Sequence, residues 1–182
     1  MKAIMAMASN RVIGKNNGLP WPSIKEDFKW FKEFTMGKNL IVGHSTFLNL
    51  PPLKGRNIHF ISRPKAKTPE DIPEGDYGYY ANAHGTIGSR VCFYEEVIHG
   101  GTVVDIITGY ESRWSIEDPI IAGGAKMYEL FLPHITEFYV THINGEYEGD
   151  TFMIPFEHLF DTQRVIKEFE GGHKVMCYSK NI

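Results

Sequence analysis

One carboxylate stands among apolar side chains in the stretch GLPWPSIKEDFKWF, residues 18–31, and is a candidate for chemistry. At about 100° per helical residue, Asp27 falls on the same side as Ile24, Phe28, Trp30 and Phe31. The opposite side holds the charged residues Lys25, Glu26, Lys29, Lys32 and Glu33. An acid in a first helical turn can also be a solvated residue favoured by the helix dipole. Because charged residues already cover the other side, we favour a buried functional carboxylate, whose pKa burial should raise.

Two junctions between a strand and a helix carry glycine and could bind phosphate. The stretch LIVGHSTF turns at Gly43, and IIAGGAKMYELF turns at Gly123 and Gly124. Glycine lets the backbone approach an anion, which the first amides of the helix stabilise. Such a junction is also an ordinary turn of an α/β protein, and neither is a Walker loop or a G-x-G-x-x-G motif. Together they suit a ligand with two phosphates.

Other basic residues lie near these stretches. Arg56, in PPLKGRNIHF, could hold a carboxylate through its planar guanidinium, or could be a solvated turn residue. His44, Arg63, Lys65 and Lys126 could recognise an additional phosphate, or could be ordinary surface charges.

Composition favours one globular domain spanning 1–182, with 42% hydrophobic residues and a formal net charge of -3. With no five-residue basic run, we expect no nucleic-acid partner. The run AIMAMA is too short to span a membrane or to indicate a signal peptide. Cys92 and Cys177 form no C-x-x-C motif, which favours the reducing cytoplasm, and no histidine spacing indicates a metal site.

The pattern of apolar residues predicts an α/β fold with a mainly parallel sheet covered on both faces. The expected strands are Lys2–Ala8, Asn39–Val42, Asn57–Ile61, Val91–Glu95, Pro119–Ala122 and Thr136–Ile143. The expected helices are Ile24–Thr35, Ser45–Asn49, Val103–Tyr110 and Ala125–Phe131, the first with a capping box from Ser23 to Glu26. RVIKEFE and KVMCYSK flank Gly171 and Gly172 as an antiparallel hairpin, which makes the sheet mixed. Residues 64–101 show no clear period.

The chain resembles the dihydrofolate reductase family. The matching stretches are RVIGKNNGLPW, DFKWFKEFT, VGHSTF, LKGRNIHFISR, GGAKMYELFLP and YVTHINGEYEGDTFMIP, in the family's order. They cover most of the chain outside 64–101, which is longer than the family's usual connection. The resemblance implies a single-domain α/β fold with a central mixed sheet and a C-terminal antiparallel hairpin. It also implies reduction of 7,8-dihydrofolate with NADPH. We further expect the chain to be a monomer in the cytoplasm.

The resemblance implies roles for residues that contact the substrate. Asp27 would hydrogen-bond the 2-amino group and adjacent ring nitrogen of the pterin, and Thr141 would support the same amino group. Arg56 would pair with the α-carboxylate of the substrate's glutamate. Leu19 and Trp21, in the mobile loop Gly14–Trp21, would lie at the reacting edge, where water would protonate N5. The expected lining of the pocket is Ile4, Met5, Phe28, Phe31, Leu50 and Leu53.

The resemblance likewise implies a set of residues that hold NADPH. Ala6, Ile13, Gly14 and Gly18 would lie near the nicotinamide, and Ser62 and Arg63 near the adenosine. The two phosphate turns would be Gly43, His44, Ser45 and Thr46, and Ala122, Gly123, Gly124, Ala125, Lys126, Met127 and Tyr128. Three positions depart from the family pattern: Ala122 replaces a bulkier Ile or Val, Ala125 a third glycine, and His44 an Arg or Lys that reads the 2′-phosphate. Arg63 would partly restore recognition of that phosphate.

Two other functions remain open at this point. A reductase of riboflavin synthesis could use the same scaffold, although Asp27 and the G-L-P-W loop argue against it. A folate- or nucleotide-binding protein without catalysis could use residues 64–101 as a partner surface. Tight folate binding without turnover would favour the latter.

Overall fold

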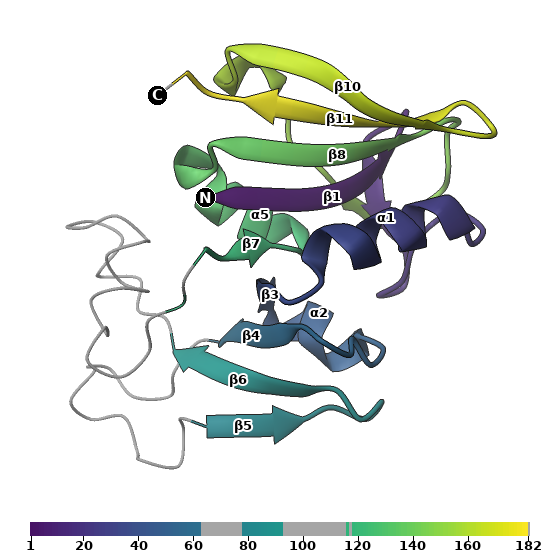
Figure 1. Ribbon diagram of the computed structural model, residues 1–182. Helices are drawn as coiled ribbons and strands as arrows, with labels where there is room; N and C mark the ends of the chain where they lie inside the picture. The colour runs from purple at the N-terminus through teal and green to yellow at the C-terminus, as the bar shows by residue number, and fades with distance from the viewer. Residues whose placement is uncertain (63–77, 93–115, 117, 182) are drawn as a thin grey trace.

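A mixed sheet organises the part of the chain that the computed structural model describes, residues 1–62, 78–92, 116 and 118–181 (Figure 1). Its strands are β1 (Lys2–Ala8), β3 (Asn39–Gly43), β4 (Asn57–Ser62), β5 (Gly78–Ala81), β6 (Ile87–Cys92), β7 (Ile120–Ile121), β8 (Glu137–Ile143), β10 (Thr162–Phe169) and β11 (His173–Ser179). They are ordered β10-β11-β8-β1-β7-β3-β4-β6-β5. A separate ribbon pairs β2 (Val12–Gly14) with β9 (Thr151–Phe152).

The middle of the sheet is parallel from β8 to β6, and its two margins are antiparallel. Leu40, Ile41 and Val42 of β3 are almost fully buried, as expected for a parallel strand covered on both faces. The predicted mixed α/β sheet is therefore confirmed.

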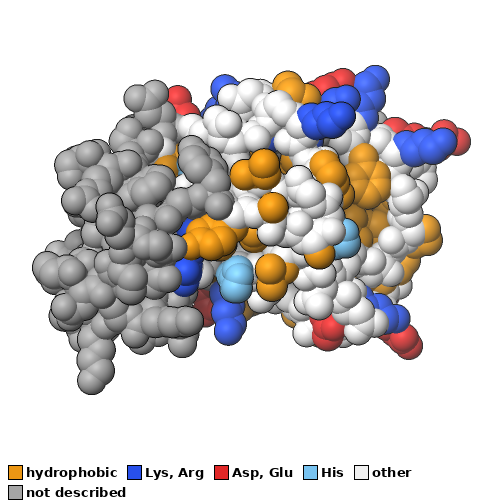
Figure 2. Space-filling view, turned by 90° about the horizontal axis from the view of Figure 1, so that it is seen from below, with side chains coloured by type: hydrophobic (Ala, Val, Ile, Leu, Met, Phe, Trp, Pro, Cys, Tyr) orange, Lys and Arg blue, Asp and Glu red, His pale blue; other side chains and the backbone are white. Residues whose placement is uncertain are grey.

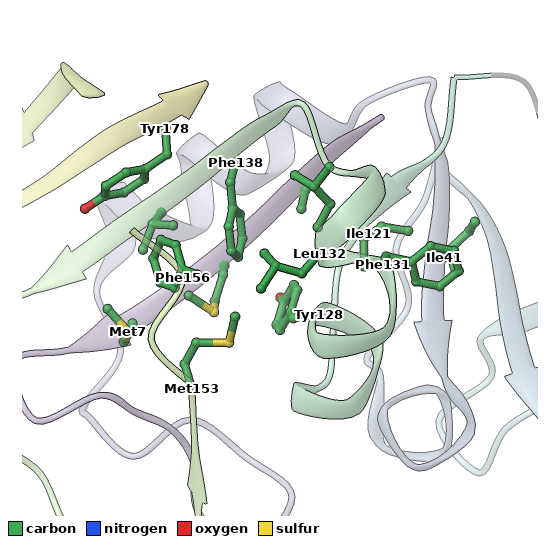
Figure 3. Packing of buried hydrophobic residues seen from close by; sticks show 14 of the residues in the cluster. Met7, Ile41, Ile121, Tyr128, Phe131, Leu132, Phe138, Met153, Phe156 and Tyr178 are labelled. Atoms are coloured by element: carbon green, nitrogen blue, oxygen red, sulfur yellow. The ribbon is translucent and has the colours of Figure 1, made fainter. Parts of the chain in front are cut away.

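Helices cover both faces of this sheet. α1 (Lys25–Thr35) and α2 (His44–Asn49) lie on one face, where Phe31, Phe34 and Phe47 pack against β1, β3 and β4. α5 (Ala125–Phe131) lies on the other face and continues into a 3₁₀ helix, η4 (Leu132–His134). Figure 3 shows this second core, in which Tyr128, Phe131 and Leu132 meet side chains of the strands. A further 3₁₀ helix, η5 (Glu157–Leu159), precedes β10.

The predicted C-terminal hairpin is confirmed as β10 and β11. Gly171 and Gly172 have φ of 92° and 82°, a left-handed conformation that glycine adopts without the steric cost of a side chain. β11 also pairs with β8, so the hairpin extends the main sheet beside the strand that carries Thr141.

Several expected boundaries are wrong. α1 begins at Lys25 with Ile24 as N-cap and without a side-chain capping bond, so the predicted box from Ser23 to Glu26 does not form. The extended backbone of Ile24 starts the helix one residue late, which moves Ser23 outside the N-cap position. The strand expected at Val91 begins at Ile87, and β5 was not predicted. The helix expected at Val103–Tyr110 and residues 93–95 lie outside the described residues.

The described surface mixes small apolar patches with charges of both signs. Figure 2 shows hydrophobic side chains on the face seen from below, with most acidic and basic side chains near its outline. Within the described residues, no helix combines the length and hydrophobicity that crossing a membrane requires.

Candidate active site

Asp27 lies in the first turn of α1 and faces β8. The Thr141 hydroxyl donates a hydrogen bond of 2.7 Å to Asp27 Oδ1, and the Thr141 side chain is only 1% exposed. The carboxylate therefore points toward the sheet, and the expectation that it lies on the inner side of the helix is confirmed. One carboxylate oxygen is fixed by the threonine, and the other can accept further donors.

Burial raises the pKa of the Asp27 carboxyl above its ordinary value, as predicted. The hydrogen bond from Thr141 opposes this rise because it stabilises the ionised form, and the charge of His173 opposes it to a smaller degree. Desolvation is the largest cause, which matches a half-buried acid beside apolar side chains.

The apolar residues expected around Asp27 divide between two cores. Ile4, Phe31, Leu50 and Leu53 pack in the cluster on the α1 face. Met5 belongs to the opposite cluster with α5, because successive residues of a strand point to opposite faces. The structure therefore does not bring the Met5 side chain to Asp27, which corrects that expectation. Phe28, expected to be buried, is 50% exposed.

Arg56 lies in the turn before β4, where its backbone N–H donates to the carbonyl of Leu53. Its Nε and Nη1 atoms are buried and have no hydrogen-bond partner among the described residues. Buried guanidinium nitrogen atoms without acceptors are costly, and an anionic ligand would supply the missing acceptors. This geometry suits a carboxylate better than the alternative of a solvated turn residue.

The loop Gly14–Trp21 is docked on residues 147–152. The Asp150 carboxylate accepts the N–H of Asn16 at 2.8 Å, and the Asp150 N–H donates to the carbonyl of Gly14 at 3.0 Å. A Cβ on Gly149 would overlap the Val12 side chain, so this close approach requires glycine. These contacts hold the ribbon of β2 and β9 together.

Within this docked loop the predicted residues differ in exposure. Trp21 is 5% exposed and packs edge-on against Tyr147 at 6.1 Å, whereas Leu19 is 47% exposed. Lys15 and Gly18 form a small bridge through paired 2.9 Å bonds at the loop tip.

Arg11 anchors the root of the same loop and was not singled out in the sequence. Its guanidinium donates to the carbonyls of Met153 and Ile154 at 3.0 and 2.6 Å and to the Glu157 carboxylate at 2.7 Å. These partners lie more than 140 residues along the chain, which is why no local pattern indicates them.

The two glycine junctions meet in the structure. The Gly43 N–H donates to the Gly123 carbonyl at 2.8 Å, and a Cβ on Gly124 would lie 3.1 Å from the Thr46 hydroxyl. The Gly123–Gly124 peptide bond is cis. α2 and α5 begin directly after these glycines, so their first-turn amides have no intrahelical acceptors. The corner fits a ligand that brings phosphate oxygens close to backbone.

The remaining cofactor candidates come from several elements. Ala6 is near the end of β1, Ile13 is in β2, and Ala122 follows β7. His44 stacks on Phe60 at 5.7 Å. Exposure differs among the others: Ser45 and Lys126 are exposed, whereas Ala125 and Met127 are partly buried. The Tyr128 side chain is buried, and its hydroxyl donates to the Ile4 carbonyl at 2.7 Å, which ties α5 to β1.

On the expected adenosine side, Ser62 is buried and its hydroxyl accepts a 2.6 Å hydrogen bond from Arg90. Arg90 is in β6 and was not predicted, because its strand lies where the sequence shows no clear period. Arg63 and Lys65 lie outside the described residues.

These groups gather at one edge of the sheet. Gly43 ends β3, Gly123 follows β7, and Ala6 and Thr141 approach the carboxyl ends of β1 and β8. Ligands of parallel α/β sheets bind at the carboxyl ends of the strands. Among the described residues, no group of three or more His, Cys, Asp or Glu side chains could hold a metal ion.

The chain is similar in sequence to known proteins. The family model described as dihydrofolate reductase matches residues 1–76 and 93–175. Dihydrofolate reductase type 8 of Escherichia coli is 28% identical over 181 residues, which cover 99% of this chain and 95% of that protein. The dihydrofolate reductase of Neisseria gonorrhoeae is 32% identical over 151 residues, 82% of this chain and 75% of that protein.

A solved structure shares the fold. Dihydrofolate reductase from Enterococcus faecalis, complexed with NADP(H) and RAB-propyl, aligns with a TM-score of 0.66 at 23% identity. The alignment covers 100% of this chain and 96% of that one. The family match omits residues 77–92, a shorter stretch than the expected insertion at 64–101, and β5 and β6 lie within it.

Proposed function

The chain belongs to the dihydrofolate reductase family, and we propose that it reduces 7,8-dihydrofolate to 5,6,7,8-tetrahydrofolate with NADPH, for use in one-carbon metabolism. The observation that carries this proposal is the inward-facing Asp27 carboxylate, fixed by Thr141 at 2.7 Å. An acceptor in this position suits a pterin, whose 2-amino group and adjacent ring nitrogen present donors side by side.

The substrate's other end carries carboxylates, and Arg56 is the cation proposed to bind one of them. Its buried Nε and Nη1 atoms require acceptors that the described residues do not supply. Leu50, Leu53 and Phe31 pack in one apolar cluster, and we place the aminobenzoyl group against them. The site therefore has a negative end, an apolar middle and a positive end.

Bound NADPH would supply the hydride for reduction of C6 of the pterin. Gly43, Thr46, Gly123 and Gly124 would hold its phosphates, because the glycines admit close approach and the helix starts favour anions. The corner lies at the same edge of the sheet as Ala6, where the nicotinamide would bind. The protein thus supplies position and electrostatics for the cofactor's chemistry.

The proton for N5 would come from water rather than from a side chain in contact with N5. Asp27 would bind and polarise the ring, while the loop Gly14–Trp21 would limit the access of water beside Leu19 and Trp21. Trp21 is buried and Leu19 is exposed, so this loop can separate the interior of the site from solvent. Excluding bulk water strengthens the electrostatic interactions within such a site.

We further propose that the chain acts as a single-domain monomer in the cytoplasm, without nucleic-acid or membrane partners. The mixed surface charges and the net charge of -3 support this. Light scattering coupled to gel filtration measures the mass directly, and a mass of two chains or more would contradict the monomer.

The reaction is tested by the loss of NADPH absorbance with and without 7,8-dihydrofolate. We expect oxidation that depends on dihydrofolate and does not occur with the pyrimidine substrate of riboflavin synthesis. Turnover of the pyrimidine alone would assign the chain to that other reductase. Tight binding of folate without any turnover would instead indicate a binding protein.

A further inference from the structure

The hairpin of β5 and β6 contacts the C-terminal end of α2, beside Leu50 of the proposed substrate site. It lies in residues 77–92, the internal stretch that the family model omits. Its turn, residues 82–86, reaches the C-terminal end of α2, which leads directly into Leu50. These contacts give the hairpin a role that the family match does not assign.

Asn82 makes the main connection and uses its whole amide group. Its Nδ2 donates to the carbonyls of Phe47 and Leu50 at 2.7 and 2.9 Å, across 35 and 32 residues. Its Oδ1 accepts the N–H groups of His84 and Thr86, both at 2.9 Å. Asn82 is 9% exposed. If its amide were rotated by 180°, Nδ2 would face two N–H donors and Oδ1 would face two carbonyl acceptors, so the observed orientation is fixed. The partners therefore fix both the turn and its attachment to α2.

Two further contacts join the same elements. The Thr86 hydroxyl donates to the Leu50 carbonyl at 3.1 Å, so this carbonyl accepts two bonds from the hairpin. Gly88 of β6 lies under the Phe47 ring, where an added Cβ would approach a ring carbon to 2.6 Å. The hairpin thus fits α2 through polar groups and through close apolar packing.

The local sequence explains why α2 depends on these donors. α2 has six residues, too few to be stable alone. At its C-terminal end the Phe47 carbonyl accepts the Leu50 N–H at 3.2 Å, and the Leu50 carbonyl lies beyond the helix. Leu50 is followed by Pro51 and Pro52, which have no backbone N–H to offer. Asn82 and Thr86 of the hairpin supply the two hydrogen bonds that the structure shows at the Leu50 carbonyl.

We propose that Asn82 and Thr86 are positioning residues for the substrate tail, acting through Leu50 and the adjoining wall of the site. The inference rests on the proposed function, because it takes Leu50 and Leu53 as contacts of the aminobenzoyl group. Neither Asn82 nor Thr86 bonds to Asp27, so the pterin end keeps its own support from Thr141.

The test compares two ligands that differ in the tail. Equilibrium dissociation constants are measured for folate and for 6-methylpterin, which has the ring without the aminobenzoyl-glutamate tail. The variants are Thr86→Val, which removes the hydroxyl at nearly constant volume, Thr86→Ser, which keeps it, and Asn82→Ala. Thermal unfolding of each variant reports on the fold, and the Thr86 pair decides the question where Asn82→Ala does not fold.

In Thr86→Val we expect the dissociation constant for folate to rise about threefold and at most about tenfold, because the energy of one internal hydrogen bond limits how much binding the displacement of Leu50 can cost. The constant for 6-methylpterin should stay within about twofold of the wild type, and Thr86→Ser should resemble the wild type for both ligands. KM for dihydrofolate should rise with folate's constant while kcat changes little.

Equal losses of affinity for folate and 6-methylpterin would indicate a general destabilisation of the site and would overturn the proposal. Unchanged affinity for folate in Thr86→Val and Asn82→Ala would also overturn it. A wild-type chain that binds folate no more tightly than 6-methylpterin would also overturn it. A wild-type chain that binds folate normally yet does not oxidise NADPH would overturn the proposed reaction and leave the positioning role standing.

Discussion

Replacing Asp27 with asparagine keeps the shape of the side chain and removes its charge. The new asparagine can still accept the Thr141 hydroxyl bond through its Oδ1, so the local geometry should persist. Its amide nitrogen would offer donors where the pterin also presents donors. The variant therefore tests the carboxylate itself rather than the packing of α1.

The expected magnitude follows from the proposed binding of two substrate donors. A hydrogen bond to a charged group contributes about 1.5–3 kcal/mol. Losing two such bonds corresponds to about 3–6 kcal/mol, or roughly a 10²- to 10⁴-fold fall in kcat/KM at neutral pH. Steady-state oxidation of NADPH over a range of dihydrofolate concentrations measures this fall.

Glu26→Gln is a matched control, because it also removes one negative charge from the first turn of α1, but from an exposed side chain. We expect its kcat/KM to stay within about twofold of the wild type, since exposed charges contribute little. Near-normal turnover of a folded Asp27→Asn variant at neutral pH would refute the assignment of the acid.

The raised pKa of Asp27 also predicts an effect on stability. Between the ordinary carboxyl value of 3.8 and the raised native pKa, the folded chain binds more protons than the unfolded chain. Stability contributed by this group therefore falls as pH rises through that range, and the ionised acid destabilises the fold above it. Urea unfolding at neutral pH should show Asp27→Asn at least as stable as the wild type, with the difference shrinking as pH falls toward 3.8. A marked loss of stability at neutral pH would contradict this.

Three further substitutions test other parts of the site. Arg56→Gln should raise KM for dihydrofolate about 10- to 100-fold, because a charged hydrogen bond to the tail is lost, and should leave KM for 6-methyl-dihydropterin unchanged. Equal effects on both KM values would contradict the assignment of Arg56 to the tail. Gly149→Ala should lower turnover by displacing the loop, and adding Val12→Ala should recover part of it, whereas unchanged turnover in Gly149→Ala would show that the loop tolerates the overlap. Arg11→Gln should speed hydrogen exchange at the loop amides about tenfold or more, through loss of its charged bonds. Lys180→Gln, which also removes bonds to backbone carbonyls, should leave those amides protected, and equal exchange in both variants would contradict a role for Arg11 in the loop.

The parts of the site that were predictable rest on local patterns. A period of 3.6 residues places Asp27 on the apolar side of α1, so its orientation could be predicted without knowing which element packs against the helix. The meeting of Gly43 and Gly123 follows from parallel strands, whose carboxyl ends share one edge of the sheet. Met5 shows the limit of carrying roles over by position, since the alternation of β1 sends its side chain to the other core.

The parts that were missed depend on contacts between distant segments. Asn82 reads locally as a turn residue, and nothing near it indicates that its amide reaches Phe47 and Leu50. Arg11 likewise reads as a surface charge until Met153 and Glu157 are placed beside it. Such bonds leave no period in the sequence, because one donor meets one carbonyl at a single point. The predicted start of α1 was wrong because Ile24, with an extended backbone, occupies the N-cap position. Ser23 therefore lies one residue too early for its side chain to accept the capping hydrogen bond.

The two charged groups of the site share a physical feature that links stability to binding. Burial disfavours the charged form of Asp27 and raises its pKa, and Arg56 holds buried nitrogen atoms without partners among the described residues. Each is unfavourable in the free chain and becomes favourable when a ligand supplies the opposite group. A pterin with a carboxylate tail offers donors to the first and acceptors to the second, at opposite ends of one molecule. We therefore predict that a ligand with donors at one end and a carboxylate at the other binds more tightly than a ligand that satisfies only one of the two groups.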